Sequence, residues 1–218
     1  MSGIVGSRHN IRGSGLVGSL GTDGQVFTSS GAGAGAAFEA AAAGGAWTFI
    51  KSITASGAGD VQFVNGTSDV VFDSTYIAYK IYGFNISTDN DDDILRGTYS
   101  DDTGTSYETS NYDCKCGSVI TSSVTRFDDT ASAFYINALG TAAEENLVFN
   151  WIIYNPADDS SFTWSNYDGI FRNMSGGAVY TAFAGSVYKV TDDIDAVKFE
   201  FADGNITGLF KLYGLSPS

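Results

Sequence analysis

Apolar side chains recur at every second position along much of the sequence from Trp47 onward. Residues 197–201 (VKFEF) alternate apolar and charged side chains, which predicts a strand with one buried and one solvated face. Residues 147–154 (LVFNWIIY) are mostly apolar at both alternating sets of positions. This strand is therefore expected to be central and covered on both faces.

Similar runs are spread over the chain and predict an all-β fold. Further strands are expected at 47–54, 61–64, 76–86, 94–99, 119–126, 133–139, 162–164, 179–190 and 209–213. Turns are expected at Asn65-Gly66, Asp168-Gly169, Gly176-Gly177 and Asp203-Gly204. About a dozen strands without a long helix indicate a two-sheet sandwich, with a jelly roll as the first choice. A parallel β-helix is the rival architecture, but the sequence shows no short repeated rung.

The N-terminal 45 residues differ in character from the rest and are expected to form an extended arm and linker, ahead of a β-sandwich head at 46–218. The motif SGIVGS at 2–7 returns as SGLVGS at 14–19, and residues 34–46 are almost wholly Ala and Gly. Such a composition buries too little apolar surface to fold alone, which favours an arm that docks onto another protein over a disordered leader. The expected anchoring residues are Ile4, Val5, Arg8, Arg12, Leu16 and Val17.

Charge excludes some classes of partner. The formal net charge is −14, and residues 1–20 hold two Arg and no acidic residue. An acidic body repels phosphates, so no nucleic acid partner is expected. No apolar run is long enough to span a bilayer and no signal peptide is evident, so membrane insertion is not expected either.

Catalytic residue types are scarce or poorly placed. The single histidine, His9, lies in the arm, where it cannot be held rigidly against a nucleophile. Acidic pairs such as Asp101-Asp102 leave a two-carboxylate glycosidase open by inventory, but adjacent Asp residues in turns are usually solvated caps. A non-enzymatic protein is expected.

Cys114 and Cys116 are expected to be reduced thiols, because a bond between residues two apart would strain a strand.

Acidic residues at 89, 91 and 93 are the one candidate metal site. Asp89, Asp91 and Asp93 resemble the start of a calcium loop, but Ile94 stands where an EF-hand needs Gly and Ser100 where it needs Glu. The EF-hand interpretation fails. A different kind of Ca²⁺ loop remains as an alternative to a plain acidic turn.

Four aromatic residues are candidates for contact with a glycan. Tyr107, Tyr112, Trp164 and Tyr167 lie in or beside segments rich in Ser, Asn and Asp. An exposed ring can stack on a sugar while neighbouring amides bind its hydroxyls. The competing interpretation places these rings in the core, as for most aromatics of a β-sandwich.

Short motifs along the chain resemble those of marine bacteriophage virion proteins. Residues 24–33 (GQVFTSSGAG) are similar to the GQVLTSNGAG segment common in tail-fibre-like proteins. Residues 70–76 (VVFDSTY), continuing through Tyr79-Lys80, resemble a domain of many such virion proteins, and 101–107 (DDTGTSY) resembles its S-x-D-x-G-x-S-Y stretch. The ending at 206–215 (ITGLFKLYGL) matches its closing IKLYG strand. The resemblance covers most of residues 24–215.

The resemblance implies a homotrimeric structural component of a phage virion, made in the cytoplasm of the bacterial host. The arm would attach to other virion proteins, residues 21–45 would bundle three chains, and loops of the head would contact a host surface glycan. The chain lacks the repetitive shaft of a long tail fibre, which leaves a short spike or a capsid decoration protein open. A free carbohydrate-binding module or polysaccharide depolymerase is the alternative outside the virion.

Overall fold

A computed structural model describes residues 25–28, 37–40, 47–120, 123–172 and 178–217. The chain divides into two units, Met1–Gly45 and Ala46–Ser218. In the first unit, β1 (Gln25–Thr28) pairs antiparallel with β2 (Ala37–Ala40). The six expected anchoring residues, from Ile4 to Val17, lie outside the described residues.

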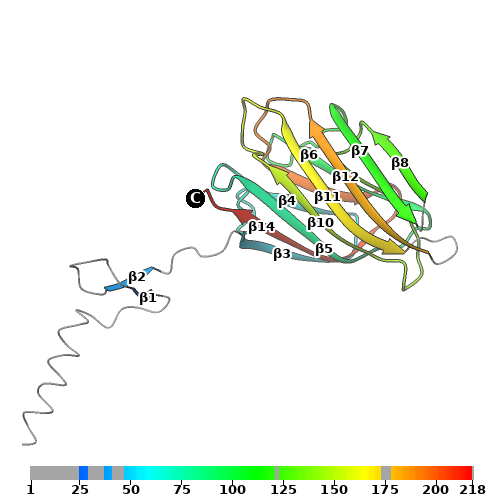
Figure 1. Ribbon diagram of the computed structural model, residues 1–218, viewed down its shortest axis with the longest axis horizontal. Coiled ribbons are helices and arrows are strands. Elements are labelled where there is room, and N and C mark those ends of the chain that lie inside the picture. The colour runs from blue at the N-terminus through cyan, green and yellow to red at the C-terminus, as the bar shows by residue number, and fades with distance from the viewer. Residues whose placement is uncertain (1–24, 29–36, 41–46, 121–122, 173–177, 218) are drawn as a thin grey trace, which may run out of the picture. The chain divides into compact units, whose positions relative to one another are not determined.

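The second unit is a sandwich of two antiparallel sheets, which confirms the expected all-β, two-sheet class. Figure 1 looks onto the larger sheet, which has eight strands in the order β3-β14-β5-β10-β11-β12-β7-β8. These are β3 (Trp47–Ala58), β14 (Ile206–Leu215), β5 (Ala78–Thr88), β10 (Leu147–Tyr154), β11 (Thr163–Arg172), β12 (Val179–Tyr188), β7 (Tyr112–Ile120) and β8 (Ser123–Asp129). The described residues contain no helix.

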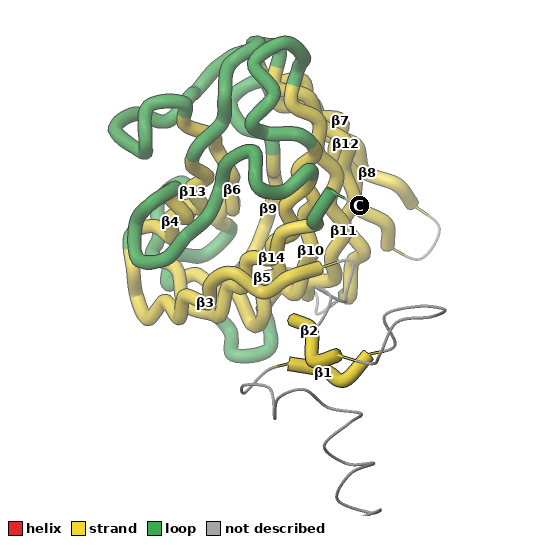
Figure 2. The backbone as a smooth tube through the Cα atoms, turned by 90° about the vertical axis from the view of Figure 1, so that its left-hand side faces the viewer, coloured by secondary structure: helices red, strands yellow, loops and turns green. Residues whose placement is uncertain are grey.

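The smaller sheet has four strands, in the order β4-β13-β6-β9, and packs on one face of the larger sheet (Figure 2). These strands are β4 (Asp60–Val64), β13 (Ala196–Phe201), β6 (Asp93–Ser100) and β9 (Phe134–Leu139). Their inward side chains meet those of the larger sheet in one core. Its rings include Phe134, Phe149, Trp151, Phe199 and Phe210, whose centroids lie 4.7 to 6.1 Å apart in the contacting pairs.

Two strands that follow one another in the chain enter different sheets and join both. β13 lies between β4 and β6 in the smaller sheet, and β14 lies between β3 and β5 in the larger one. The turn between them is held by the buried carboxylate of Asp93, which accepts hydrogen bonds from the backbone N–H groups of Ala202, Asp203 and Gly204.

Two local expectations are wrong, and the two uses of glycine account for the first. The expected turn at Asp168-Gly169 lies inside β11, which therefore extends well beyond the strand expected at 162–164. Gly169 is present there because a side chain would meet the backbone of Val148 and the Cβ of Phe149. The strand expected at 119–126 is instead the hairpin of β7 and β8. The turn at Asn65-Gly66 is observed, with Gly66 at φ 74°.

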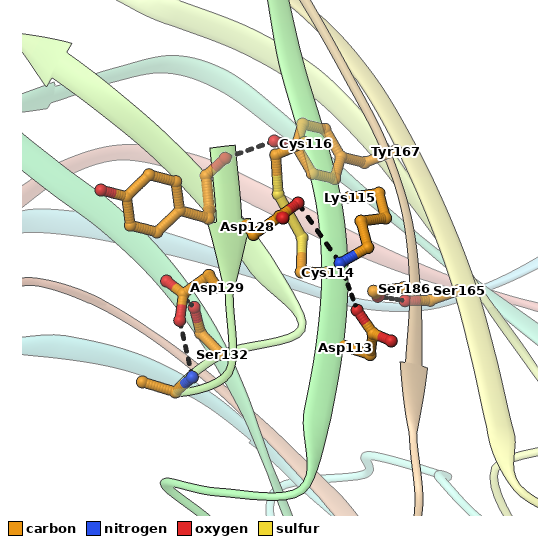
Figure 3. The surroundings of a disulfide bond; sticks show 12 residues. Asp113, Cys114, Lys115, Cys116, Asp128, Asp129, Ser132, Ser165, Tyr167 and Ser186 are labelled. Carbon is orange, nitrogen blue, oxygen red and sulfur yellow. Dashed lines mark hydrogen bonds and ion pairs between the residues drawn. A yellow bond between two sulfur atoms is a disulfide. The ribbon is translucent and has the colours of Figure 1, made fainter. Parts of the chain in front are cut away.

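The two cysteines form a disulfide, so the expectation of reduced thiols is wrong in this structure (Figure 3). Strand alternation places Cys114 and Cys116 on the inner face of β7, on either side of the outward-pointing Lys115. Their Cα atoms lie 5.9 Å apart, which is within the range that a disulfide spans. Both side chains are buried.

Thiol labelling tests the disulfide. Because both cysteines are bonded to each other, iodoacetamide should label no thiol in the denatured, unreduced protein and two after reduction. Intact mass spectrometry reads the number of labels. Two labels without reductant would contradict the bond.

A glycine on β5 tests the packing between the sheets. A Cβ at Gly83 would overlap the ring of Phe149, which is buried and cannot move aside. We expect Gly83→Ala to lower the free energy of unfolding by about 1 to 3 kcal/mol, measured by urea denaturation. Gly185→Ala, on β12, is the matched control, because a Cβ there has no heavy atom within 4 Å. Equal unfolding midpoints for the two variants would contradict the described packing.

Candidate interaction surface

The outer faces of the two sheets differ sharply. The outer face of the smaller sheet carries polar residues and is overlain by the loop that follows β6. The hydroxyl of Tyr107 in this loop donates a hydrogen bond to Gln62 Oε1 at 2.8 Å, and Lys198 Nζ lies 4.8 Å from the centre of the same ring. This face is therefore largely closed by the chain itself.

The outer face of the larger sheet, named the sheet face below, is open and rich in apolar side chains. Eight large hydrophobic residues on it are at least one-third exposed, with Val179 at 63% and Trp164 at 59%. The eight are Phe49, Phe84, Val148, Tyr154, Trp164, Ile170, Val179 and Phe183. Only Ile77 and Phe162 among the exposed large hydrophobics of the described residues lie elsewhere. A contiguous exposed apolar surface of this kind marks an interaction site.

The middle of the sheet face is an apolar row that crosses four strands. Leu209 on β14 lies opposite Phe84 on β5, and Val148 on β10 lies opposite Ile170 on β11. Beside this row is a shallow depression of about 230 Å³. Its lining residues include Tyr82, Phe84, Val148, Asn150, Asp168 and Ile170.

Aromatic residues occupy the β3 side of the sheet face. The ring of Tyr213 meets Phe49 and Tyr82 edge to face, with centroids 5.5 and 5.7 Å apart. Lys80 Nζ lies 4.5 Å from the ring centre of Trp47 and 5.5 Å from that of Tyr82. These contacts hold the rings and the lysine in a defined arrangement.

Basic residues are concentrated on the sheet face. Five of the nine Lys and Arg residues of 46–218 point outward from its strands, against three of the 23 acidic residues. The basic residues are Lys80, Lys115, Arg126, Arg172 and Lys211, and the acidic ones are Asp113, Asp128 and Asp168. The sheet face thus has a formal charge of +2, whereas the remainder of 46–218 has −16.

Only one of the four aromatic residues expected to contact a glycan is fully available. Tyr112 and Tyr167 are buried, so the expectation is wrong for both. Tyr112 Oη accepts a hydrogen bond from the backbone N–H of Tyr99 at 2.8 Å, and Tyr167 Oη donates to the carbonyl of Tyr135. Tyr107 is half-buried over the smaller sheet. Trp164 is exposed, on the sheet face rather than in a loop.

The expected carboxylates at 89, 91 and 93 do not form a shared site. Asp93 is buried and holds the turn before β14, and Asp89 accepts two hydrogen bonds from Asn205. The side chain of Asp91 is exposed. No group of three or more metal-binding side chains comes together within the described parts of the chain. The spacing of these residues is therefore explained by turn capping.

Further carboxylates gather in the loops beside β6 and β13, where they organise turns. Asp102 accepts hydrogen bonds from the backbone and hydroxyl of Ser106 and from the Ser100 hydroxyl, and these lower its pKa to about 2. Asp195 accepts hydrogen bonds from the backbone N–H of Thr103. Partial desolvation raises the pKa of Asp101, and the nearby Asp192 raises it further.

No family model matches this sequence, and no curated protein is significantly similar to it. The part of the chain that the structure describes holds no helix capable of crossing a membrane.

Sequence reasoning missed the sheet face because it interpreted apolar residues on both sides of a strand as buried. Residues 147–154 do form a central strand, β10, with β5 and β11 as neighbours. The expected second cover is absent from the described unit, so Val148 and Tyr154 are each 42% exposed. The apolar pattern therefore predicted a central strand correctly, but only one of its two faces lies in the core.

The turn at Asp102 predicts a pH-dependent contribution to stability. Because the folded state lowers the pKa of Asp102 below its ordinary value of 3.8, this contribution is complete above about pH 4 and is lost as the pH falls towards 2. We expect Asp102→Asn to lower the melting temperature at pH 7 and to match the wild type near pH 2. Asp91→Asn, at an exposed carboxylate outside this turn, is the control. A melting-temperature difference that persists unchanged at pH 2 would contradict the assignment.

Proposed function

We propose that this protein is a non-enzymatic structural subunit of a phage virion. Its arm attaches to other virion proteins, three chains associate, and the β-sandwich head faces outward toward the host surface. The observation that carries the proposal is the open, apolar sheet face, because an assembling subunit needs such a surface and a solitary domain does not. The motifs at 24–33, 70–76, 101–107 and 206–215 supply the link to phages.

The arrangement of carboxylates further favours a structural role over hydrolysis. Two acidic side chains with several hydrogen bonds, Asp93 and Asp102, accept them from backbone groups and from serine or threonine hydroxyls that fix turns. A glycosidase instead needs two carboxyl groups facing each other across a sugar-binding cleft.

A capsid decoration protein is the variant of this proposal that places the subunit on the head shell. It uses the same arm and the same sheet face. Position on the particle separates the two, since decoration proteins cover the shell whereas fibres and spikes cluster at the tail. Immunogold labelling of particles reads that position directly.

Carbohydrate binding has one specific observation in its favour. Trp164 and Tyr154 are exposed and lie opposite each other on β11 and β10, and the hydroxyl of Tyr154 donates a hydrogen bond to Asn166 at 2.6 Å. A sugar ring could stack on Trp164 while the amide of Asn166 binds a hydroxyl group. This use competes with protein contact, because both would occupy the same face.

Deletion of the arm tests the virion proposal. Removing residues 1–20 should abolish incorporation into particles, because the repeated apolar pairs and both arginines of the arm are lost. The truncated protein should keep the thermal unfolding profile of the full chain, since the sandwich lies wholly within 46–218. Purified particles are assayed by immunoblotting, with the full-length chain as control. Normal incorporation of the truncated protein would contradict an anchoring role for the arm.

A further inference from the structure

We propose that the sheet face is covered by a second copy of this chain, and that this contact builds the oligomer. The inference rests on the proposed virion subunit and names the surface through which its copies meet. It begins from β10, whose inner residues pack in the core while Val148 and Tyr154 remain uncovered on the other side.

The chemistry of the row across the middle favours a protein as the cover. Val148, Ile170 and Leu209 offer only aliphatic surface, which gains from burial against apolar side chains and makes no hydrogen bond to a hydroxylated ligand. The aromatic rings of Phe84, within this row, and of Phe183, on the neighbouring strand β12, are also typical of the centre of protein interfaces.

The size of the sheet face suits a stable association. Eight strands spaced by about 4.8 Å span roughly 34 Å, and the outward residues extend roughly 25 Å along the strands. The resulting area is about 850 Å² for the whole face of one copy, close to the roughly 800 Å² that each partner contributes to a standard protein interface.

Charge selects a second copy over an unrelated partner. The rest of 46–218 carries a formal charge of −16, so two copies repel each other across most of their surfaces. The sheet face, at +2, is the region where copies can meet without that repulsion. The sheet face needs no oppositely charged partner. Its Lys80 and Lys211 lie on other strands than its Asp168, so the lysines of one copy can meet the aspartate of another.

The two halves of the sheet face complement each other. The half formed by β3, β14 and β5 carries Lys80 and Lys211 and no outward acidic residue. The other half carries Asp168 on β11, which makes no ion pair with the described residues. Charges around Asp168 are largely paired already, since Lys115 contacts Asp113 and Asp128 at 2.8 and 3.3 Å and Arg172 contacts Glu144 at 2.9 Å.

The lysine half of one copy therefore fits the Asp168 half of the next. When each contact joins two unlike halves and the assembly closes into a ring, every copy uses both of its halves. A ring of three agrees with the trimer proposed above. Arg126 lies on the edge strand β8, at the border of this contact.

The first test is the native mass of the full-length chain by sedimentation velocity. The wild type should sediment as three chains, and Ile170→Glu should sediment as one, because it places a charge within the apolar row. Ile77→Glu is the matched control. Ile77 is 45% exposed but lies outside the sheet face, so this variant should remain trimeric.

A second pair of variants keeps the test decisive if Ile170→Glu does not fold. Lys211→Asp and Asp168→Lys should each weaken association about tenfold or more, and combining them should restore much of the loss. In the wild type, hydroxyl-radical oxidation of Trp164 and Phe183 should fall when the protein is concentrated. Oxidation of Tyr107, which is half-buried over the smaller sheet, should not change.

Other outcomes would overturn the inference in distinguishable ways. A trimer that is unaffected by Ile170→Glu and by both charge variants would place association elsewhere, such as the arm, and would leave the virion proposal standing. A monomeric wild type at about 100 µM would rule out self-association through this face. If Ile170→Glu were then lost from particles, another virion protein would be the cover, and if it lost binding on a glycan array, the cover would be a sugar.

Discussion

The buried carboxylate of Asp93 fixes the turn between β13 and β14, and both sheets depend on the strands on either side of that turn. Three backbone N–H groups donate hydrogen bonds to this one side chain, which leaves none of these three donors of the turn unpaired. The turn directs β13 into the smaller sheet and β14 into the larger. Each strand then supplies the partner for two others, so the geometry at Asp93 aligns the two layers of the sandwich.

The two sheets differ in size and in how far the chain covers their outer faces. Loops help four strands to cover the inner face of eight, and a further loop, anchored by Tyr107, closes the outside of the smaller sheet. Nothing in the described unit does the same for the outside of the larger sheet. Several of its outward side chains are nevertheless apolar, such as Ile170 and Phe183, at positions where a solvated sheet would carry Lys, Thr or Glu.

The sequence predicted local structure correctly where a residue pattern has only one physical cause, and it failed where a pattern has two. Alternation at 197–201 has one cause and correctly predicted β13 and its buried face. Gly169 had two uses, a turn or a close approach, and only its contact with Phe149 decides between them. The cysteines had two outcomes, which depend on a Cα separation that sequence spacing does not fix. The exposure of Tyr112 and Tyr167 depended on strand register, since a shift by one residue moves a side chain to the opposite face.

The order of the strands also has a consequence for the growing chain on the ribosome. β3 and β5 are synthesised more than a hundred residues before β14, the strand that lies between them in the sheet. Likewise, β4 and β6 are synthesised long before β13, the strand that pairs with both. Until then, four strands present unpaired backbone edges of the kind that recruit other chains. Closing such distant pairs is also slow. A nascent chain with this topology must therefore remain soluble through most of its synthesis, and its high content of acidic residues offers the charge repulsion that keeps neighbouring chains apart during that time.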